Sequence, residues 1–318
     1  MKQRKLLPLG SSGGGAAFSA SVSAYLLLSL LAAAIISVSG IAGTDGAKYI
    51  NYLVSPIAVA VVLTLALKYY NQPARQLLPV KTHPKYIAMG LLIIFGLLFS
   101  LSWVNEWFIK LLELMGYKRN ASSLPDLSGA KIVPAILVIA VIPAVMEEIL
   151  FRGIILNNAE GDAGSLRTIF LVGFVFSLYH GSVEQTIYQF ICGCLFALLA
   201  IRAHSLVPSV IIHFINNALI IILYACGVVD AAGELLISES VKIAIYTLSA
   251  ASLVGGVVWL VIDSLPAKLR RIEDGETTKT VRISKFKPVK EGGIKRFFVT
   301  ASVGIAAMGI IWIVGLFL

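Results

Sequence analysis

Charged residues are scarce in this chain of 318 residues: only 14% are Asp, Glu, Lys or Arg, whereas 58% are hydrophobic. An ordinary soluble domain carries about 25% charged and roughly 45–50% apolar residues. An apolar excess of this size cannot be hidden in one globular core, so most of the chain must be dissolved in lipid. The scarcity of charge therefore excludes a soluble domain and predicts an integral membrane protein.

Cysteine is also rare, with three residues, and acidic residues are outnumbered by 26 Lys and Arg, which gives a net charge of +9. Cys192, Cys194 and Cys226 all fall in apolar segments without a CxxC pair. We interpret them as small buried residues and not as a disulfide framework. The positive residues lie almost entirely between apolar segments, as in membrane-protein loops. Anionic lipid, and not nucleic acid, is therefore the expected partner of this charge.

Nine segments are apolar for long enough to cross a bilayer, which takes about 17–25 helical residues. They are 18–42, 50–70, 86–108, 131–155, 165–181, 184–203, 206–226, 241–263 and 297–318. The fifth is the shortest and is polar at its far end. The predicted fold class is all-α, a polytopic bundle of about nine transmembrane helices.

The loops set the orientation of the bundle. A cytoplasmic N-terminus places 20 of the 26 positive residues on the cytoplasmic side, as the positive-inside preference requires. Residues 1–17 then form a cytoplasmic, flexible N-terminus, because they contain a Gly- and Ser-rich run. The basic loop 264–296 is the one sizeable soluble piece, and we expect it to contact anionic lipid, with a docking site for a partner as the alternative.

The fourth apolar segment carries Glu147, Glu148 and Arg152 in its second half. Each charge at the middle of a membrane helix costs about 2.5–3.5 kcal/mol, so these groups must be paired or used. Glu148 and Arg152 are four residues apart, in the favourable order for an ion pair on one helix face. Glu147 lies about 100° around the helix and has no local cation, which suits a general base. The alternative is a purely structural acid–base pair.

Two of the four histidines lie in apolar segments. His180 ends the run FVFSLYH, and Phe176 precedes it by one helical turn. His213 is followed four residues later by Asn217, so both lie on one helix face. A lone membrane histidine often only packs against a carbonyl group, and this role stays open for both. Together with the two acids, however, they indicate a polar site inside the bundle.

The depths of these side chains can be estimated from the cytoplasmic ends of their helices. Glu147 lies about 13 Å deep, His213 about 10 Å and His180 about 22 Å, at 1.5 Å per residue. The first two depths agree. A tilted or broken fifth helix is needed to bring His180 level with them.

Three motifs of the chain resemble those of the CPBP family, which contains the type II CAAX prenyl endopeptidases and bacterial Abi-like, bacteriocin-processing relatives. The motif EExxxR matches Glu147–Arg152, FxxxH matches Phe176–His180 and HxxxN matches His213–Asn217. They occur in the family's order on helices four, five and seven. The resemblance covers residues 131–226, which would form a CAAX-protease-like catalytic core. The flanking parts are the helices of 18–130 and the C-terminal helices of 227–318.

The resemblance implies an intramembrane endopeptidase of a bacterial plasma membrane that hydrolyses a peptide bond of a membrane-embedded or lipid-anchored protein or peptide. It implies that Glu147 and His180 activate a water molecule. It further implies that His213 and Asn217 hold the developing oxyanion. Three side chains would support the site: Glu148, Arg152 and Phe176.

Members of this family are often called metalloproteases, and zinc normally takes three protein ligands. Glu147, His180 and His213 could supply them, but the motif HExxH is absent, and we favour a mechanism without a metal. Two other classes of function stay open. One is a non-catalytic immunity or binding membrane protein of the same fold. The other is an ion-coupled transporter, since ionisable residues within membrane helices also mark ion pathways.

Overall fold

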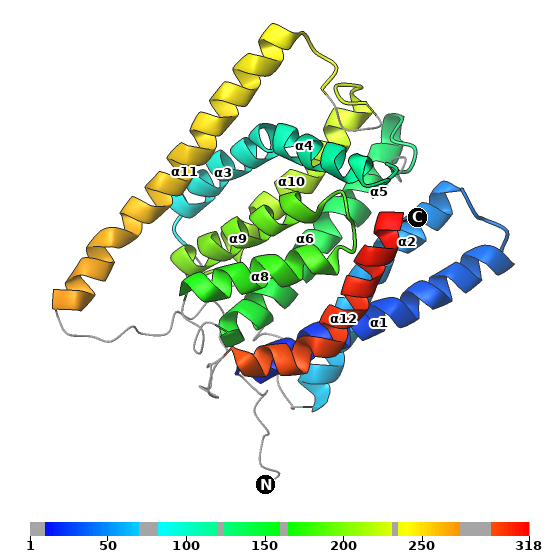
Figure 1. The fold of residues 1–318 in the computed structure, drawn as a ribbon, viewed down its shortest axis with the longest axis horizontal. Coiled ribbons are helices and arrows are strands. Elements are labelled where there is room, and N and C mark those ends of the chain that lie inside the picture. The colour runs from blue at the N-terminus through cyan, green and yellow to red at the C-terminus, as the bar shows by residue number, and fades with distance from the viewer. Residues whose placement is uncertain are drawn as a thin grey trace.

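The computed structural model describes residues 10–69, 82–119, 124–159, 165–230, 235–273 and 294–317 (Figure 1). These ranges form helices joined by loops, with no strand among them apart from one isolated bridge between Val229 and Leu235. Eight helical stretches within them are long and apolar enough to cross a membrane, and the helix of the fifth predicted segment is a shorter apolar one. The prediction of an all-α, polytopic membrane bundle is confirmed.

The helices follow the nine predicted segments in chain order. Outside the fourth segment they are α1 (Ser11–Val38), α2 (Asp45–Tyr69), α3 (Lys85–Ser100), α4 (Ser102–Leu114), α8 (Ser165–Tyr179), α9 (Thr186–Ala203), α10 (Val207–Ala225), α11 (Glu239–Glu273) and α12 (Lys295–Phe317). Figure 1 shows α6, α8, α9 and α10 at the centre, with α11 on one side and α1, α2 and α12 on the other. Many large apolar side chains of the outer helices are exposed, as lipid-facing surfaces are.

The N-terminal run of glycines is helical from Ser11, inside the segment 1–17 that was predicted to be flexible; residues 1–9 lie outside the described ranges. Gly14 and Gly15 are buried in α1. A Cβ atom at Gly15 would collide with the Thr300 side chain and the Phe297 carbonyl of α12. Gly15 therefore lets two helices from opposite ends of the chain approach closely, and the prediction of a flexible segment was wrong from Ser11 onward. Of the predicted loop 264–296, the part up to Glu273 is helical and 274–293 lie outside the described ranges.

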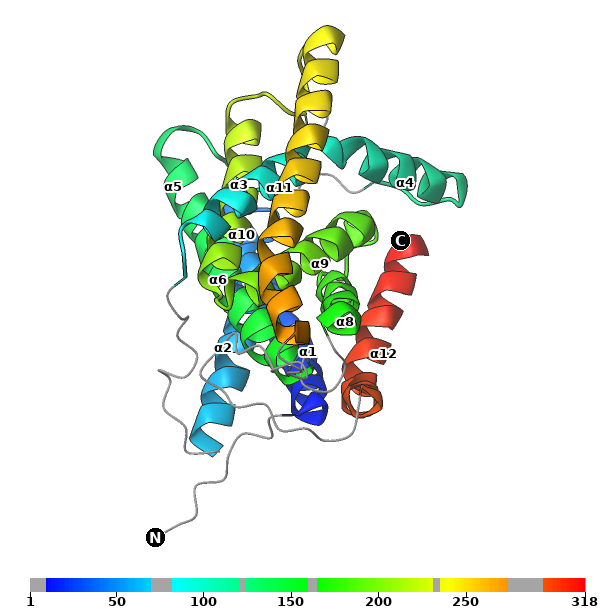
Figure 2. The ribbon, with the colours of Figure 1, turned by 90° about the vertical axis from the view of Figure 1, so that its left-hand side faces the viewer.

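The third predicted segment, 86–108, is not one straight helix. The chain changes direction at Leu101, between α3 and α4, and α4 runs across the end of the bundle (Figures 1 and 2). Trp103 and Trp107 of α4 are exposed, and tryptophan is enriched where a membrane meets water. Hydropathy could not find the bend, because the apolar run continues through it.

The fourth segment changes its helical type several times. Its parts are η2 (Gly129–Lys131), α5 (Ile132–Ala135), the π-helix η3 (Ile136–Val141), α6 (Ile142–Glu148) and the π-helix η4 (Ile149–Leu156). Pro143 lies in the first turn of α6, directly after η3, and it has no N–H to donate to the preceding helical turn. Wide π turns inside α-helices occur frequently at functional sites. The two acids occupy the last turn of α6, between the two π stretches.

The core of the bundle consists largely of aromatic and branched side chains. Phe18, Phe151, Phe176 and Phe196 are fully buried within one cluster that joins α1, η4, α8 and α9. Cys192 is buried in this cluster and Cys194 is half-buried against it, as predicted. Cys226 is exposed instead, because it follows the last residue of α10.

Candidate active site

The two consecutive acids of α6 have different surroundings. Glu148 is fully buried, and its Oε1 accepts a hydrogen bond of 2.8 Å from Arg152 Nη1. Arg152 is fully buried as well, and its Nη2 donates to the Gly193 carbonyl at 2.9 Å. The rings of Phe176 and Phe196 lie 4.5 and 5.5 Å from its guanidinium carbon. The ion pair expected from the i, i+4 spacing is present, and it occupies the interior of the bundle.

His213 of α10 faces both acids. Its Nδ1 lies 3.0 Å from Glu148 Oε1, the oxygen that also accepts from Arg152. A carboxylate only accepts, so His213 Nδ1 carries the proton of this bond. Its Nε2 lies 3.9 Å from Glu147 Oε2. Glu148 thus fixes the orientation in which the imidazole faces Glu147.

His180 follows the last residue of α8. Its Nδ1 lies 2.8 Å from the Phe176 carbonyl oxygen, which can only accept, so this nitrogen also carries a proton. Its Nε2 lies 3.7 Å from Glu147 Oε2. This contact places His180 level with Glu147, as the proposed site requires.

Three groups therefore converge on one point. Glu147 Oε2 is buried, has no hydrogen-bond partner, and lies within 4 Å of Nε2 of both His180 and His213. Because both Nδ1 atoms are engaged, each Nε2 of a neutral imidazole offers a lone pair to the same space. The edge of the Phe176 ring packs against both imidazoles, with centroid distances of 4.7 and 5.9 Å. The arrangement suits a small hydrogen-bond donor held between a carboxylate and two imidazoles.

Asn217 is one turn beyond His213 on α10, but its amide does not face Glu147. Its Nδ2 donates to the Ile139 carbonyl of η3 at 3.4 Å, and its Oδ1 accepts from Asn216 Nδ2 at 3.0 Å. The Tyr188 hydroxyl in turn donates to Asn216 Oδ1. The structure thus places six of the seven predicted side chains in one connected group. The seventh, Asn217, contacts the Ile139 carbonyl and Asn216 instead.

The donor atoms of Glu147, His180 and His213 are of the kinds that zinc accepts, and both Nδ1 atoms have the outer partners typical of metal-bound histidines. Within the described ranges, however, no group of three or more His, Cys, Asp or Glu side chains is arranged as a metal site. The zinc alternative is therefore supported by the chemistry of the donors and not by their arrangement.

Comparison with known protein families assigns the middle of the chain. Residues 129–219 match the family described as type II CAAX prenyl endopeptidase Rce1-like. This segment is similar to the Rce1-like family, and we call it the Rce1-like segment. The Rce1-like segment begins at η2, ends two residues after Asn217 and contains all seven predicted site residues, so the resemblance inferred from three motifs is confirmed. Comparisons with curated proteins and with solved structures found no match.

Sequence reasoning missed several residues of the Rce1-like segment. Gly193 contributes a backbone carbonyl to Arg152, and no side-chain pattern could have indicated this. Phe196 packs against both Arg152 and the His213 ring, at 5.5 and 5.6 Å. Tyr188 of α9 is half-buried and Asn216 of α10 is buried, and the adjacent pair Asn216–Asn217 was the only available signal for them.

Proposed function

We propose that the protein is an intramembrane endopeptidase in which Glu147 activates a water molecule for attack on a peptide carbonyl. The observation that carries this proposal is the buried, unpartnered Oε2 of Glu147 with the Nε2 atoms of two histidines around it. The Rce1-like family is a protease family, and this supports a peptidase.

In the proposed reaction, water donates hydrogen bonds to Glu147 and to His180. Glu147 takes one proton while the water oxygen attacks the carbonyl carbon of the substrate. The carbon–nitrogen bond then breaks, and Glu147 passes its proton to the leaving amine. His180 is 19% exposed whereas Glu147 is 9% exposed, which supports entry of water from the side of His180.

His213 is proposed to stabilise the oxyanion of the tetrahedral intermediate. Its Nδ1–H is held by Glu148, and the charge of Glu148 is balanced by Arg152. In this role His213 needs a proton on Nε2 as well as on Nδ1, and Nε2–H then donates a hydrogen bond to the oxyanion. Asn217 would supply a second donor by exchanging the Ile139 carbonyl for the substrate. Removing one such donor typically costs about 100- to 1000-fold in rate.

We favour this mechanism without a metal ion, and zinc is the alternative cofactor. Glu147, His180 and His213 would then hold the metal. Zinc would polarise the carbonyl group and lower the pKa of its bound water. In both cases the chain's own residues do the same work: Glu148 and the Phe176 carbonyl orient the imidazoles, and Arg152 balances the charge of Glu148.

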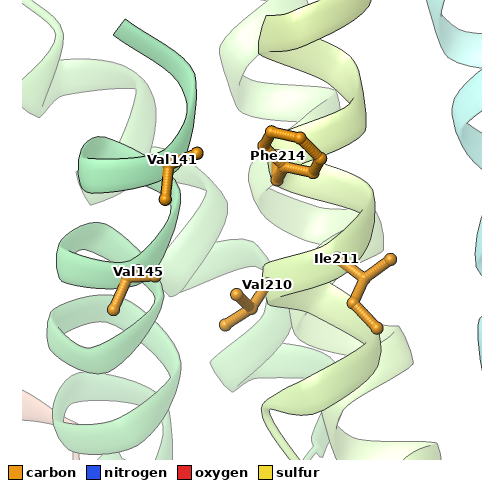
Figure 3. A pocket seen from close by; sticks show the side chains of 5 residues that line it. All are labelled: Val141, Val145, Val210, Ile211 and Phe214. Carbon is orange, nitrogen blue, oxygen red and sulfur yellow. The ribbon is translucent and has the colours of Figure 1, made fainter. Parts of the chain in front are cut away.

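An apolar groove next to these residues supports a membrane-embedded or lipid-anchored substrate. It lies between α6, the end of η3 and α10 and has a volume of about 260 Å³ (Figure 3). Its lining consists of five apolar residues: Val141, Val145, Val210, Ile211 and Phe214. Val145 is two residues before Glu147, and Phe214 follows His213 directly. A lining without polar side chains cannot pair the backbone of an extended peptide, so it fits an apolar chain or a helix face.

The test is a comparison of membrane peptides in cells that carry wild-type protein, Glu147→Gln or Glu239→Gln. Glu239 is a matched control, because its side chain is 80% exposed at the start of α11. We expect mass spectrometry to find cleavage products with the wild-type protein and the control. They should fall at least about 1000-fold with Glu147→Gln, as expected when the residue that activates the nucleophile is removed.

Equal product levels in the three strains, with equal amounts of protein in the membrane, would refute the peptidase. A phenotype that survives Glu147→Gln would then indicate a non-catalytic immunity or binding protein. Loss of a solute flux without any change in peptides would indicate a transporter.

A further inference from the structure

Helix α12 lies outside the Rce1-like segment, yet it packs against the loop that comes after His180. We propose that Trp312 of α12 is a positioning residue, which holds this loop and thereby sets the distance between His180 and Glu147. The inference rests on the proposed function, because it assigns a role to α12 in the same catalytic site. It concerns the loop 180–185, which joins α8 to α9.

A chain of hydrogen bonds connects α12 with both ends of this loop. Trp312 Nε1 donates to the Thr186 hydroxyl at 2.7 Å. The Thr186 hydroxyl donates to the Val183 carbonyl at 2.8 Å, and the Thr186 carbonyl accepts from the Ser177 hydroxyl at 2.8 Å. Ser177 lies in the last turn of α8, three residues before His180. One indole N–H is therefore linked to the turn that carries the imidazole.

Van der Waals contacts place α12 directly over the residue after His180. Gly181 has φ +60°, a conformation that favours glycine and ends α8. A Cβ atom at Gly181 would lie 3.1 Å from Met308 Cε and 3.4 Å from Ile311 Cγ2. Trp312 also packs with the buried side chain of Val183 in a small apolar cluster. A shift of α12 would therefore move the backbone on which His180 sits.

His180 depends on such support more than His213 does. His213 lies inside α10 and is held by the buried Glu148. His180 lies after the end of α8, and the Nδ1 of its side chain donates to the carbonyl of Phe176 on the same helix. The far side of the loop has a second support, because the Tyr117 hydroxyl donates to Glu184 Oε1 at 2.6 Å. The loop is thus in contact with α12 on one side and with the segment after α4 on the other.

Helix α12 is itself tied firmly to the bundle through α1. The Thr300 hydroxyl donates to the Ser12 carbonyl, and the Ser19 hydroxyl donates to the Thr300 carbonyl, both at 2.8 Å. Gly304 N donates to the Ser19 hydroxyl at 3.1 Å. The first and last helices are therefore joined by several hydrogen bonds, and these bonds restrict the movement of α12 relative to the loop.

The direct test observes the histidines rather than the reaction. The full-length protein contains four histidines, so a sample with isotope-labelled histidine gives four imidazole signals by NMR. Substitution of each histidine in turn assigns these signals. We compare wild-type protein with Trp312→Phe, Thr186→Val and the control Trp259→Phe, which makes the same change on a partly exposed residue of α11.

We expect Trp312→Phe and Thr186→Val to move the His180 signal in the same direction while the other three signals stay in place. Trp259→Phe should move none of them. An unchanged His180 signal in Trp312→Phe would overturn the proposal. Movement of all four signals would overturn it too, because it would indicate a general loosening of the bundle.

A second measurement uses the cleavage product identified with wild-type and Glu147→Gln protein. Trp312→Phe should lower kcat by about 10-fold with little change in KM, since small displacements of catalytic groups cost up to about 100-fold. The double variant should have the same kcat as Thr186→Val alone, because Thr186→Val already removes the bond to Trp312 together with the bond to the Val183 carbonyl. Multiplying losses, or a change in KM alone, would contradict the role. If Glu147→Gln retains cleavage, the proposed function fails, whereas the NMR result stands on its own.

Discussion

Two arginines of this protein make similar contacts in different surroundings. Arg152 is fully buried and is held by Glu148, the Gly193 carbonyl and two aromatic rings. Arg119 lies outside the membrane-spanning helices, is 25% exposed and is paired with Glu106 and Glu113 of α4. Hydrogen bonding to Glu106 raises the pKa of the Arg119 guanidinium, so it stays charged.

The two arginines differ in how strongly each depends on its acidic partners. Water can solvate Arg119 if an acid is removed, so its ion pairs contribute little to stability. Arg152 is fully buried, and the loss of its acid would leave an uncompensated charge in the interior. Only the buried arginine therefore requires its acidic partner to stay charged and in place. The ion pair with Arg152 fixes the position of Glu148, and Glu148 fixes the orientation of His213.

The largest effect on stability is expected for Glu148→Gln. The change leaves Arg152 buried without a countercharge, which typically costs about 3–5 kcal/mol. Thermal unfolding in detergent, with Glu239→Gln as the exposed control, measures the loss. Equal melting temperatures for the two variants would show that the buried charge of Arg152 does not need Glu148 as a countercharge. The buried arginine would then depend on its acid no more than Arg119 does.

A smaller and purely kinetic effect is expected for Asn217→Ala. If the amide turns from the Ile139 carbonyl to the oxyanion, the rate of cleavage should fall about 100- to 1000-fold while KM changes little. The exposed Asn51 of α2 provides a control for the same substitution. A loss below about 5-fold would restrict Asn217 to its bond with η3 and leave His213 as the oxyanion donor.

The smallest effect is expected for Arg119→Gln. Exposed ion pairs contribute about 0–1 kcal/mol, so the melting temperature should fall slightly and the fall should vanish in high salt. Cleavage activity should stay unchanged. A loss of stability as large as that of Glu148→Gln would show that the exposed ion pairs of Arg119 contribute as much to stability as the buried ion pair of Arg152, contrary to expectation.

The sequence predicted the fold because the lipid solvent leaves a strong signal. Apolar runs of the required length marked the spans, and the i, i+4 spacing of Glu148 and Arg152 marked their ion pair. The motifs indicated that Glu147 belongs with two histidines. These predictions needed only local spacing or composition.

Other features depend on contacts between distant parts of the chain. The contact of the Gly193 carbonyl with Arg152 and the contact of α12 with the loop after His180 arise from packing, which no local pattern encodes. The glycines of α1 were misread for the same reason. The small size of Gly15 permits close contact with α12, but a Gly- and Ser-rich run is equally typical of a flexible segment.

The most direct test of the account is the activity of purified full-length protein carrying Glu, Asp or Gln at position 147, each measured after treatment with a chelator. A carboxylate that acts as a base without a metal predicts full wild-type activity after chelation. It predicts a reduced but measurable rate for Glu147→Asp and a loss of at least about 1000-fold for Glu147→Gln. Cleavage by Glu147→Gln at more than about a tenth of the wild-type rate would contradict the central role of this carboxylate, and loss of wild-type activity on chelation would replace the metal-free mechanism with zinc.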